Sequence, residues 1–438
     1  MAKRLTLYIL IGLVLGLVVG IAINAAIADG TPLAQARLEG IAHWFSIVTT
    51  VFLHLIKMII APLVFATLVV GIAHMGDTSA LGRVGVKSVG WFVCASLVSL
   101  ALGMLLVNVL QPGVGLNLPL PATSATAGLD KSNFDAAKII THIFPTSIID
   151  AMAQNDILQI VVFSVFMGVA ITAVGDKAKP LVTAAEALVS VMLQITDYVM
   201  RFAPVAVFAA VAATLIEQGP GVIGRLAYFM MSVYIGLGLL WVLLLAVAFV
   251  IVGPRIGMLI RYIREPALLA FSTASSEAAF PRTLEALDRF GVPPRIASFV
   301  LPLGYSFNLD GSMMYMTFAS LFIAQAYGIH LDFATQAALL LTLMITSKGI
   351  AGVPRASLVV IAATLGQFKL PEAGLLLVLA IDHFLDMGRS ATNVIGNAVA
   401  ATVVAKWEGG FDPPAAPEIE PPHAPAGHGP AKDVDSFR

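Results

Sequence analysis

Long apolar segments recur along this chain and are separated by shorter polar ones. The apolar pattern predicts helices at residues 5–28, 41–74, 82–111, 156–175, 182–217 and 223–253. A helix that crosses a bilayer needs about 20 mostly apolar residues, and each of these segments reaches that length. The pattern therefore predicts an all-α polytopic membrane protein.

Two further segments, within residues 257–407, are apolar at both ends and polar in the middle. The first is interrupted at 272–281 and the second at 346–357, and each is followed by a long segment with polar groups, at 308–312 and 382–397. Interrupted apolar segments at matching places in two halves are typical of transporter sites near the bilayer midplane. Irregular backbone at that depth must be satisfied by protein or water. We therefore expect a duplicated unit, in which a hairpin precedes a broken or polar helix.

Two segments are too polar to span a membrane. Residues 112–155 contain several prolines and predict an extramembrane loop, and residues 411–438 are rich in Pro, Ala and acidic residues. Such a tail cannot bury a core, so we expect it to be disordered.

The composition supports a membrane protein and excludes other classes. Of the 438 residues, 58% are hydrophobic and 12% are charged, where soluble domains have about 25% charged residues. The net charge of −1 gives no basic field for nucleic acid. The single cysteine, Cys94, excludes a disulfide framework and a cysteine-built metal site, and we expect no cofactor. The apolar run after Lys3 and Arg4 is too long for a signal peptide, which predicts a retained first helix with a cytoplasmic N-terminus.

A polar stripe marks the last long helix. Its members follow one another at spacings of four, three, four and four: Asp382, Asp386, Arg389, Asn393 and Asn397. These steps keep all five side chains on one helix face. Ionisable groups inside a membrane face protein or a wet cavity and are usually functional. We interpret the stripe as the wall of a site for a charged solute.

Arg389 is the expected substrate anchor, because a guanidinium matches a carboxylate and stays charged when partly dehydrated. The alternative is an internal ion pair with Asp382 or Asp386. A carboxylate at Asp386 beside the arginine favours a zwitterion over a plain dicarboxylate. Asn393 both donates and accepts hydrogen bonds, which suits either end of an amino acid.

The polar groups before this helix have two interpretations. Asn308-Leu-Asp-Gly-Ser312 predicts an unwound turn whose carbonyls, with Asp310, bind Na⁺ or hold a proton; the alternative is a kink in which Asp310 caps the next helix. The two hairpin tips, rich in small and hydroxyl residues, predict anion-binding backbone and a gate.

Together these motifs resemble the dicarboxylate/amino acid:cation symporter family, which has the glutamate-transporter fold. The resemblance covers residues 1–410 and is densest at 265–407. It is carried by the serine-rich first tip, by 308–312, by 347–354 (Ser-Lys-Gly-Ile-Ala-Gly-Val-Pro) and by 386–393 (Asp-Met-Gly-Arg-Ser-Ala-Thr-Asn). Within the family, the bacterial proton/glutamate-aspartate carriers are the most similar, and the C4-dicarboxylate carriers are near relatives.

The resemblance implies eight transmembrane helices, two re-entrant hairpins, inverted repeats, a homotrimer and an elevator mechanism. It implies scaffold helices at 1–74 (helices one and two) and 156–217 (four and five). It implies a moving transport domain built from 82–118 (helix three), 223–253 (helix six) and the core at 257–410, with the disordered tail at 411–438.

The family's functional positions carry over to named residues of this chain. The resemblance implies substrate contacts at Ser275, Ser276, Val353, Asp386, Arg389, Ser390 and Asn393. It implies cation or proton coupling at Asn308, Asp310, Asp382 and Asn397, and a gate at Gly349, Gly352, Pro354 and Arg355.

Several departures concern the coupling ion. Sodium-coupled members have Met where this chain has Leu309, and an acid where it has Asn397; on the third helix they have Tyr and a Thr-Ser pair where it has Phe92, Ala95 and Ser96. Each change but the last removes an oxygen, a charge or a soft ligand from a sodium site. The changes favour H⁺, carried by Asp310, Asp386 or Asp382, over Na⁺.

These observations predict a secondary active symporter, not an enzyme, that imports L-glutamate or L-aspartate with protons. It is expected in the lipid of a bacterial inner membrane, with both termini cytoplasmic. The alternatives are a C4-dicarboxylate symporter, sodium-coupled aspartate transport and, from other classes, an intramembrane enzyme or a channel. No Gly-x-Ser-x-Gly or His-Glu-x-x-His motif supports an enzyme, and the paired gates argue against a channel.

Overall fold

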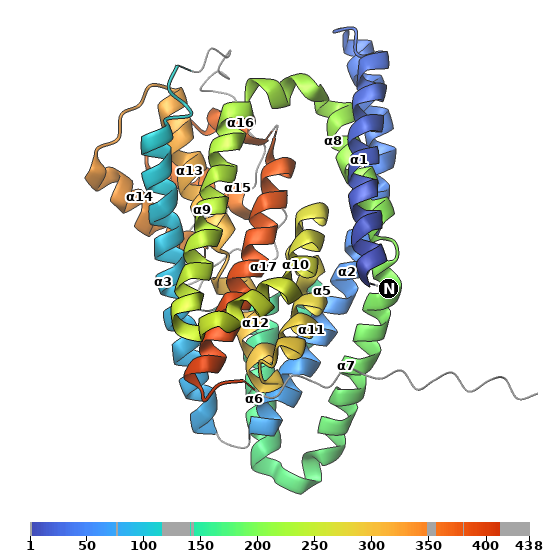
Figure 1. The fold of residues 1–438 in the computed structure, drawn as a ribbon, viewed down its shortest axis with the longest axis vertical. Helices are drawn as coiled ribbons and strands as arrows, with labels where there is room; N and C mark the ends of the chain where they lie inside the picture. The colour runs from blue at the N-terminus through green and yellow to red at the C-terminus, as the bar shows by residue number, and fades with distance from the viewer. Residues whose placement is uncertain are drawn as a thin grey trace, which may run out of the picture.

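The computed structural model describes residues 2–75, 78–115, 141, 144–347, 356–379 and 381–411. Within these ranges every regular element is a helix (Figure 1). The principal helices are α1 (Ala2–Ile27), α2 (Pro32–Met75), α3 (Thr78–Leu110), α5 (Ile148–Gln154), α6 (Ile157–Val174), α7 (Lys179–Met200), α8 (Ala203–Arg225), α9 (Ala227–Val252), α10 (Ile256–Thr273), α11 (Phe280–Phe290), α12 (Pro294–Phe307), α13 (Asp310–Ala326), α14 (Phe333–Thr346), α15 (Ala356–Gln367), α16 (Leu375–Leu379) and α17 (Asp382–Trp407). Short 3₁₀ turns are η1 (Gly175–Ala178), η2 (Gly253–Arg255), η3 (Glu277–Ala279) and η5 (Glu372–Gly374).

Five helical stretches of the described part are long and apolar enough to cross a membrane. They are Leu7–Ile27, Pro32–Ala73, Gly82–Leu110, Ile157–Met200 and Ala227–Thr273. The remaining helices are shorter or, like α17, carry polar side chains. An all-helical membrane protein is thus confirmed for the residues described.

Two predicted helices differ from the observed ones. The predicted 41–74 helix begins earlier, at Pro32, because proline suits the first turn of a helix. The polar residues that follow Pro32 made this start difficult to predict from the apolar pattern. The predicted 182–217 helix is wrong: it is two helices, α7 and α8, separated at Arg201 and Phe202. Pro204 has no N–H for the Met200 carbonyl and its ring collides with that carbonyl, so one continuous helix is disfavoured.

The duplicated unit is present. Helices α10 and α11 form a hairpin, and the broken helix α12–α13 follows it; α14 and α15 are followed by α16 and α17. The tip of the second hairpin, residues 348–355, lies outside the described residues and includes Val353 and the predicted gate. The tail from residue 412 and most of the predicted 112–155 loop also lie outside them.

The helices pack in two groups. In the first group α2 packs against α6, α7 and α8, and α1 packs against α8. In the second group α17 packs against α9, α10, α12 and α13, and α3 packs against α13. The groups meet mainly where α12 lies on α2 and α6. Figure 1 shows α1, α2, α7 and α8 along one side, α3, α9 and α13 along the other, and α17 and α10 between them.

Helix α1 approaches α8 through a row of glycines. A Cβ atom added at Gly16 would lie 2.6 Å from the Phe208 carbonyl oxygen, and one added at Gly20 would lie 2.7 Å from Leu215 Cβ. Gly12 faces Pro204 in the same way. Small residues let two helix backbones approach closely inside a membrane, so these glycines form a packing face.

We expect Gly16→Ala to lower the melting temperature of the detergent-solubilised protein, because its methyl group overpacks the α1–α8 contact at a cost of about 1–3 kcal/mol. Gly40→Ala is the matched control on α2, since a Cβ there has no neighbour within 4 Å. Equal melting temperatures for the two variants would contradict the assignment.

Candidate functional site

The polar stripe lies on the face of α17 that packs against the break between α12 and α13. Asp382, Arg389, Asn393 and Asn397 are all buried, with exposures of 4% or less, although they are polar. The Asp386 side chain is 37% exposed. The site is therefore closed by protein along most of the stripe and open at Asp386.

Arg389 lies between two carboxylates and above a ring. Its Nη2 is 3.0 Å from Oδ1 of Asp382 and 3.0 Å from Oδ1 of Asp386. Its guanidinium carbon is 4.0 Å from the centroid of the Tyr315 ring, and the Tyr315 hydroxyl donates to Asp382 at 3.3 Å. The internal ion pairs weighed against substrate binding do form, and they hold the arginine in one orientation.

Two donor groups of the same guanidinium are left over. Nε and Nη1 of Arg389 are buried and make no hydrogen bond to any of the residues that the structure describes. An unpaired buried donor costs about 1–3 kcal/mol, and more when it is charged. The Nε–H points to the Nη2 side of the guanidinium and Nη1 lies on the Cδ side, so each of these donors suits a separate carboxylate oxygen. Both interpretations of Arg389 therefore hold at once: Nη2 pairs internally, and Nε–H and Nη1–H are left for ligand oxygens.

Asn393 supports the start of α13. Its Oδ1 accepts hydrogen bonds from the backbone N–H groups of Gly311 at 2.9 Å and Ser312 at 3.3 Å, and its Nδ2 donates to Ser312 Oγ at 3.2 Å. These N–H groups belong to the first turn of α13, which has no side-chain cap from its N-cap residue Leu309. Asn393 on α17 thus caps the start of α13, which is the role that the alternative interpretation gave to Asp310.

A second polar cluster lies one turn further along α17. Asn308, Asp310 and Asn397 are all fully buried. Asn308 Nδ2 donates to Asp310 Oδ2 at 3.1 Å and to Asn397 Oδ1 at 3.3 Å, and the Ser99 hydroxyl donates to Asp310 Oδ1 at 3.3 Å. Nδ2 of Asn397 has no hydrogen-bond partner in the described part of the chain. The cluster offers several oxygens and one carboxyl group, which suit a small cation or a proton.

The first hairpin tip is a compact turn. Ala274 adopts a left-handed conformation with φ 48°, and Ser275 Oγ accepts a hydrogen bond from the Ala278 N–H at 3.2 Å. Ser275 and Ser276 are partly exposed, and the hairpin arm α10 that leads to them packs against α17. At α17 itself, Ser390 Oγ lies 3.5 Å from Asp386 Oδ1. The residues predicted around the second tip, Val353 and the gate, are not among those described.

Sequence reasoning missed Tyr315 and Ser99 near the site, and it named Ser312 only as part of the 308–312 motif. Tyr315 and Ser312 lie three positions apart on α13, inside an apolar run, and both face α17; Ser99 lies on α3. The available signal was the i, i+3 spacing of the two hydroxyl groups after Asp310.

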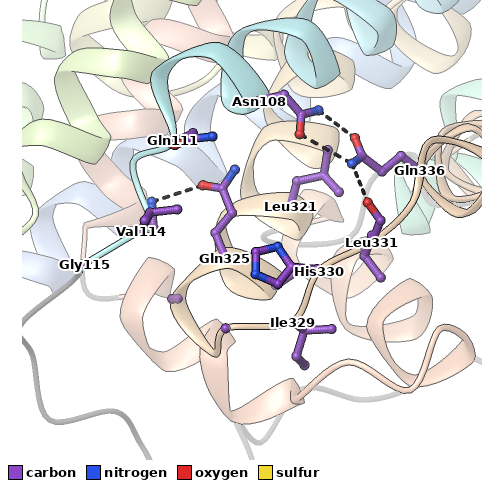
Figure 2. A pocket seen from close by; sticks show the side chains of 14 residues that line it. Asn108, Gln111, Val114, Gly115, Leu321, Gln325, Ile329, His330, Leu331 and Gln336 are labelled. Carbon is purple, nitrogen blue, oxygen red and sulfur yellow. Dashed lines mark hydrogen bonds between the residues drawn. The ribbon is translucent and has the colours of Figure 1, made fainter.

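A cavity of ≈ 420 Å³ at the other end of α13 is a weaker candidate for a charged solute. Figure 2 shows its lining, in which Asn108 and Gln336 exchange hydrogen bonds of 2.6 and 3.4 Å. Gln325 accepts from the Gly113 N–H at 3.2 Å and donates to the Val107 carbonyl at 2.9 Å. Among the residues that the structure describes, the lining contains no Asp, Glu, Lys or Arg. Its carboxamides mainly tie α3, α13 and the first arm of the second hairpin together.

Comparison with known proteins adds independent information. The model of the sodium:dicarboxylate symporter family matches residues 5–407. The proton/glutamate-aspartate symporter of Escherichia coli K12 is 42% identical over 83% of this chain and 85% of the relative. A proton/sodium-glutamate symport protein of Bacillus caldotenax is 39% identical over 88% of this chain and 91% of the relative. A C4-dicarboxylate transport protein of Rhizobium leguminosarum is 41% identical over 82% of each chain.

We expect Asn393→Ala to lower the melting temperature of the substrate-free protein, since two buried N–H groups of α13 lose their acceptor at about 1–3 kcal/mol each. Thr402→Ala is the control on the same helix, because its hydroxyl bonds only the Ala398 carbonyl of α17. If Asn393→Ala left the melting temperature unchanged and weakened only substrate binding, the supporting role would be wrong.

Proposed function

The chain belongs to the sodium:dicarboxylate symporter family, and from that premise we propose that it is a secondary active symporter that imports L-glutamate or L-aspartate with protons. The single observation that carries this proposal is that the buried donors Nε and Nη1 of Arg389 have no partner among the described residues, next to the partly exposed Asp386. A substrate carboxylate accepts a hydrogen bond from Nη1 or Nε of Arg389, and the substrate ammonium binds Asp386. Asp382 and Tyr315 hold the arginine from the other side.

Charge balance supports cotransport of a cation. Arg389 faces the carboxylates of Asp382 and Asp386, so the three groups together carry one negative charge when both acids are ionised. Glutamate or aspartate brings one further net negative charge, and a C4-dicarboxylate brings two. Excess negative charge in a closed, poorly hydrated site is strongly disfavoured. One proton that enters with an amino acid offsets the single negative charge that the substrate adds, whereas a dicarboxylate needs two protons for the same effect.

The cluster around Asn397 supports H⁺ rather than Na⁺. An amide at this position presents an N–H group, and that group has no partner, where an acid would present only oxygens. On α3, Phe92 and Ala95 offer no oxygen from their side chains. We propose that Asp310, Asp382 or Asp386 carries the proton and that no metal ion or cofactor is held permanently.

A C4-dicarboxylate symporter is the second candidate. Asp386 already pairs with Arg389 in this structure, so its charge is partly offset before any substrate arrives, and relatives described as C4-dicarboxylate transport proteins share 41% identity with this chain. The exposed carboxylate of Asp386 nevertheless repels a second anionic group, which favours the amino acid.

We propose an elevator mechanism for transport. The group around α1, α2, α6, α7 and α8 forms the scaffold of a homotrimer, and the group around α3, α9, α12, α13, α17 and the two hairpins moves across the membrane with the substrate. Lys87 near the start of α3 donates hydrogen bonds to the Trp407 carbonyl and to Glu408 at the end of α17. The start of α3 and the end of α17, which carry basic residues, therefore lie on the same side of the membrane. By the positive-inside tendency that side is cytoplasmic, in a bacterial inner membrane.

We expect aspartate and glutamate to outcompete succinate and malate for uptake into proteoliposomes, because only the amino acids bring an ammonium to Asp386. Asp386→Asn should lower the apparent affinity for both amino acids about tenfold or more, as expected for a lost charge-assisted pair. The difference between their affinity and that for succinate should become smaller. Ser390→Ala is the neighbouring control, with a smaller expected effect. Stronger competition by succinate in the native protein would contradict the proposal.

We expect a pH gradient alone, with choline replacing sodium, to drive uptake. Asn397→Asp should make uptake sodium-stimulated, because it adds a carboxylate oxygen and a charge to the cluster around Asp310. Asn108→Asp, far from that cluster in the cavity of Figure 2, is the control and should stay sodium-independent. An absolute sodium requirement of the native protein would overturn proton coupling.

A further inference from the structure

An ion-pair network crosses from one helix group to the other at α7 and α11. The Nη2 of Arg282 on α11 pairs with Oδ1 of Asp197 on α7, and its Nη1 pairs with Glu285 on its own helix at 2.9 Å. The Arg282 side chain is only 18% exposed, and its Nε has no hydrogen-bond partner. Burying the Arg282 guanidinium to this extent has a desolvation cost, which its two carboxylate partners offset.

The two helices are otherwise loosely joined. Helix α7 packs mainly on α2, and α11 packs mainly on α10 and α12. A cavity of ≈ 280 Å³ lies beside the ion pair and is lined by both helices, with Val189 and Leu193 from α7 and Leu284 and Glu285 from α11. The interface at this point therefore depends on charge rather than on close apolar packing.

We propose that Arg282 and Asp197 form an electrostatic catch that stabilises the present position of the moving group against the scaffold. The inference rests on the proposed elevator mechanism. Any slide of α11 past α7 separates the two charges, whereas the Arg282–Glu285 pair travels with α11 and is not broken. The Arg282–Asp197 pair thus stabilises only the present conformation, and its strength affects how often the moving group leaves this conformation.

The consequence is a measurable shift in population. Asp197 is 47% exposed, so its pair with Arg282 is partly screened by solvent. A half-exposed ion pair of this kind corresponds to a change of roughly two- to fivefold in an equilibrium. Removing either charge should shift the equilibrium away from the present state by that factor, without changing the substrate site on α17.

The test is a double-mutant cycle with a reporter in the cavity. In a Cys94→Ser background, Val189→Cys on α7 reports exposure of the interface through its rate of thiol labelling. We expect Asp197→Asn and Arg282→Gln each to raise the labelling rate roughly two- to fivefold. The double variant should label at the same rate as the single ones, because either substitution alone already removes the whole interaction.

Arg289→Gln is the control, because Arg289 lies 3.9 Å from Glu285, within α11, and is 61% exposed. Thermal stabilisation by aspartate is measured on every variant. If the native protein binds no acidic substrate, the proposed function fails whatever the labelling shows. If substrate binds but Asp197→Asn labels like the native protein, or the two single effects add, the catch is wrong.

Discussion

The structure depends on one buried guanidinium. Arg389 is 2% exposed inside a helix group made largely of apolar residues, and the cost of burying such a charge must be met by partners. Asp382, Asp386 and the ring of Tyr315 supply them on one side. Nε and Nη1 have no partner among the residues that the structure describes, and two unpaired buried donors cost stability in the empty protein. A carboxylate ligand removes that cost, so the same interaction explains binding and the selection of anions.

The break between α12 and α13 provides backbone groups that stabilise the surroundings of this arginine. A continuous α12–α13 helix would have its N–H groups occupied at Gly311 and Ser312; the break frees them, and Asn393 bonds both. Gly311 lets this turn approach α17 closely, since a Cβ atom there would lie 2.6 Å from the Arg389 carbonyl oxygen. The arginine and the break are therefore fixed by the same short stretch of α17, and the proton or cation cluster at Asp310 lies beside them.

Much of this arrangement was predictable from sequence. Helical spacing placed the five polar residues of α17 on one face, the two polar interruptions located the hairpins, and the 308–312 motif located the break at 308–309. The partners of that face were not predictable, because periodicity shows which side chains share a face but not which helix covers it. For this reason the contacts of Tyr315, Ser312 and Ser99 could not be predicted. Asn393 was expected to contact substrate, and only the structure shows that its amide is occupied by α13. The α7–α8 break was readable from Pro204 and from the charged Asp197 and Arg201 just before it, but the apolar residues on both sides favoured one long helix.

The most direct test of the account is an experimental structure of the protein with L-aspartate bound, at a resolution that defines the ligand. The account predicts one substrate carboxylate within hydrogen-bond distance of Nη1 or Nε of Arg389, with the ammonium on Asp386 and with Asp382 still paired to Nη2. A ligand held elsewhere, while both of these donors stay unpaired or contact only protein, would contradict it.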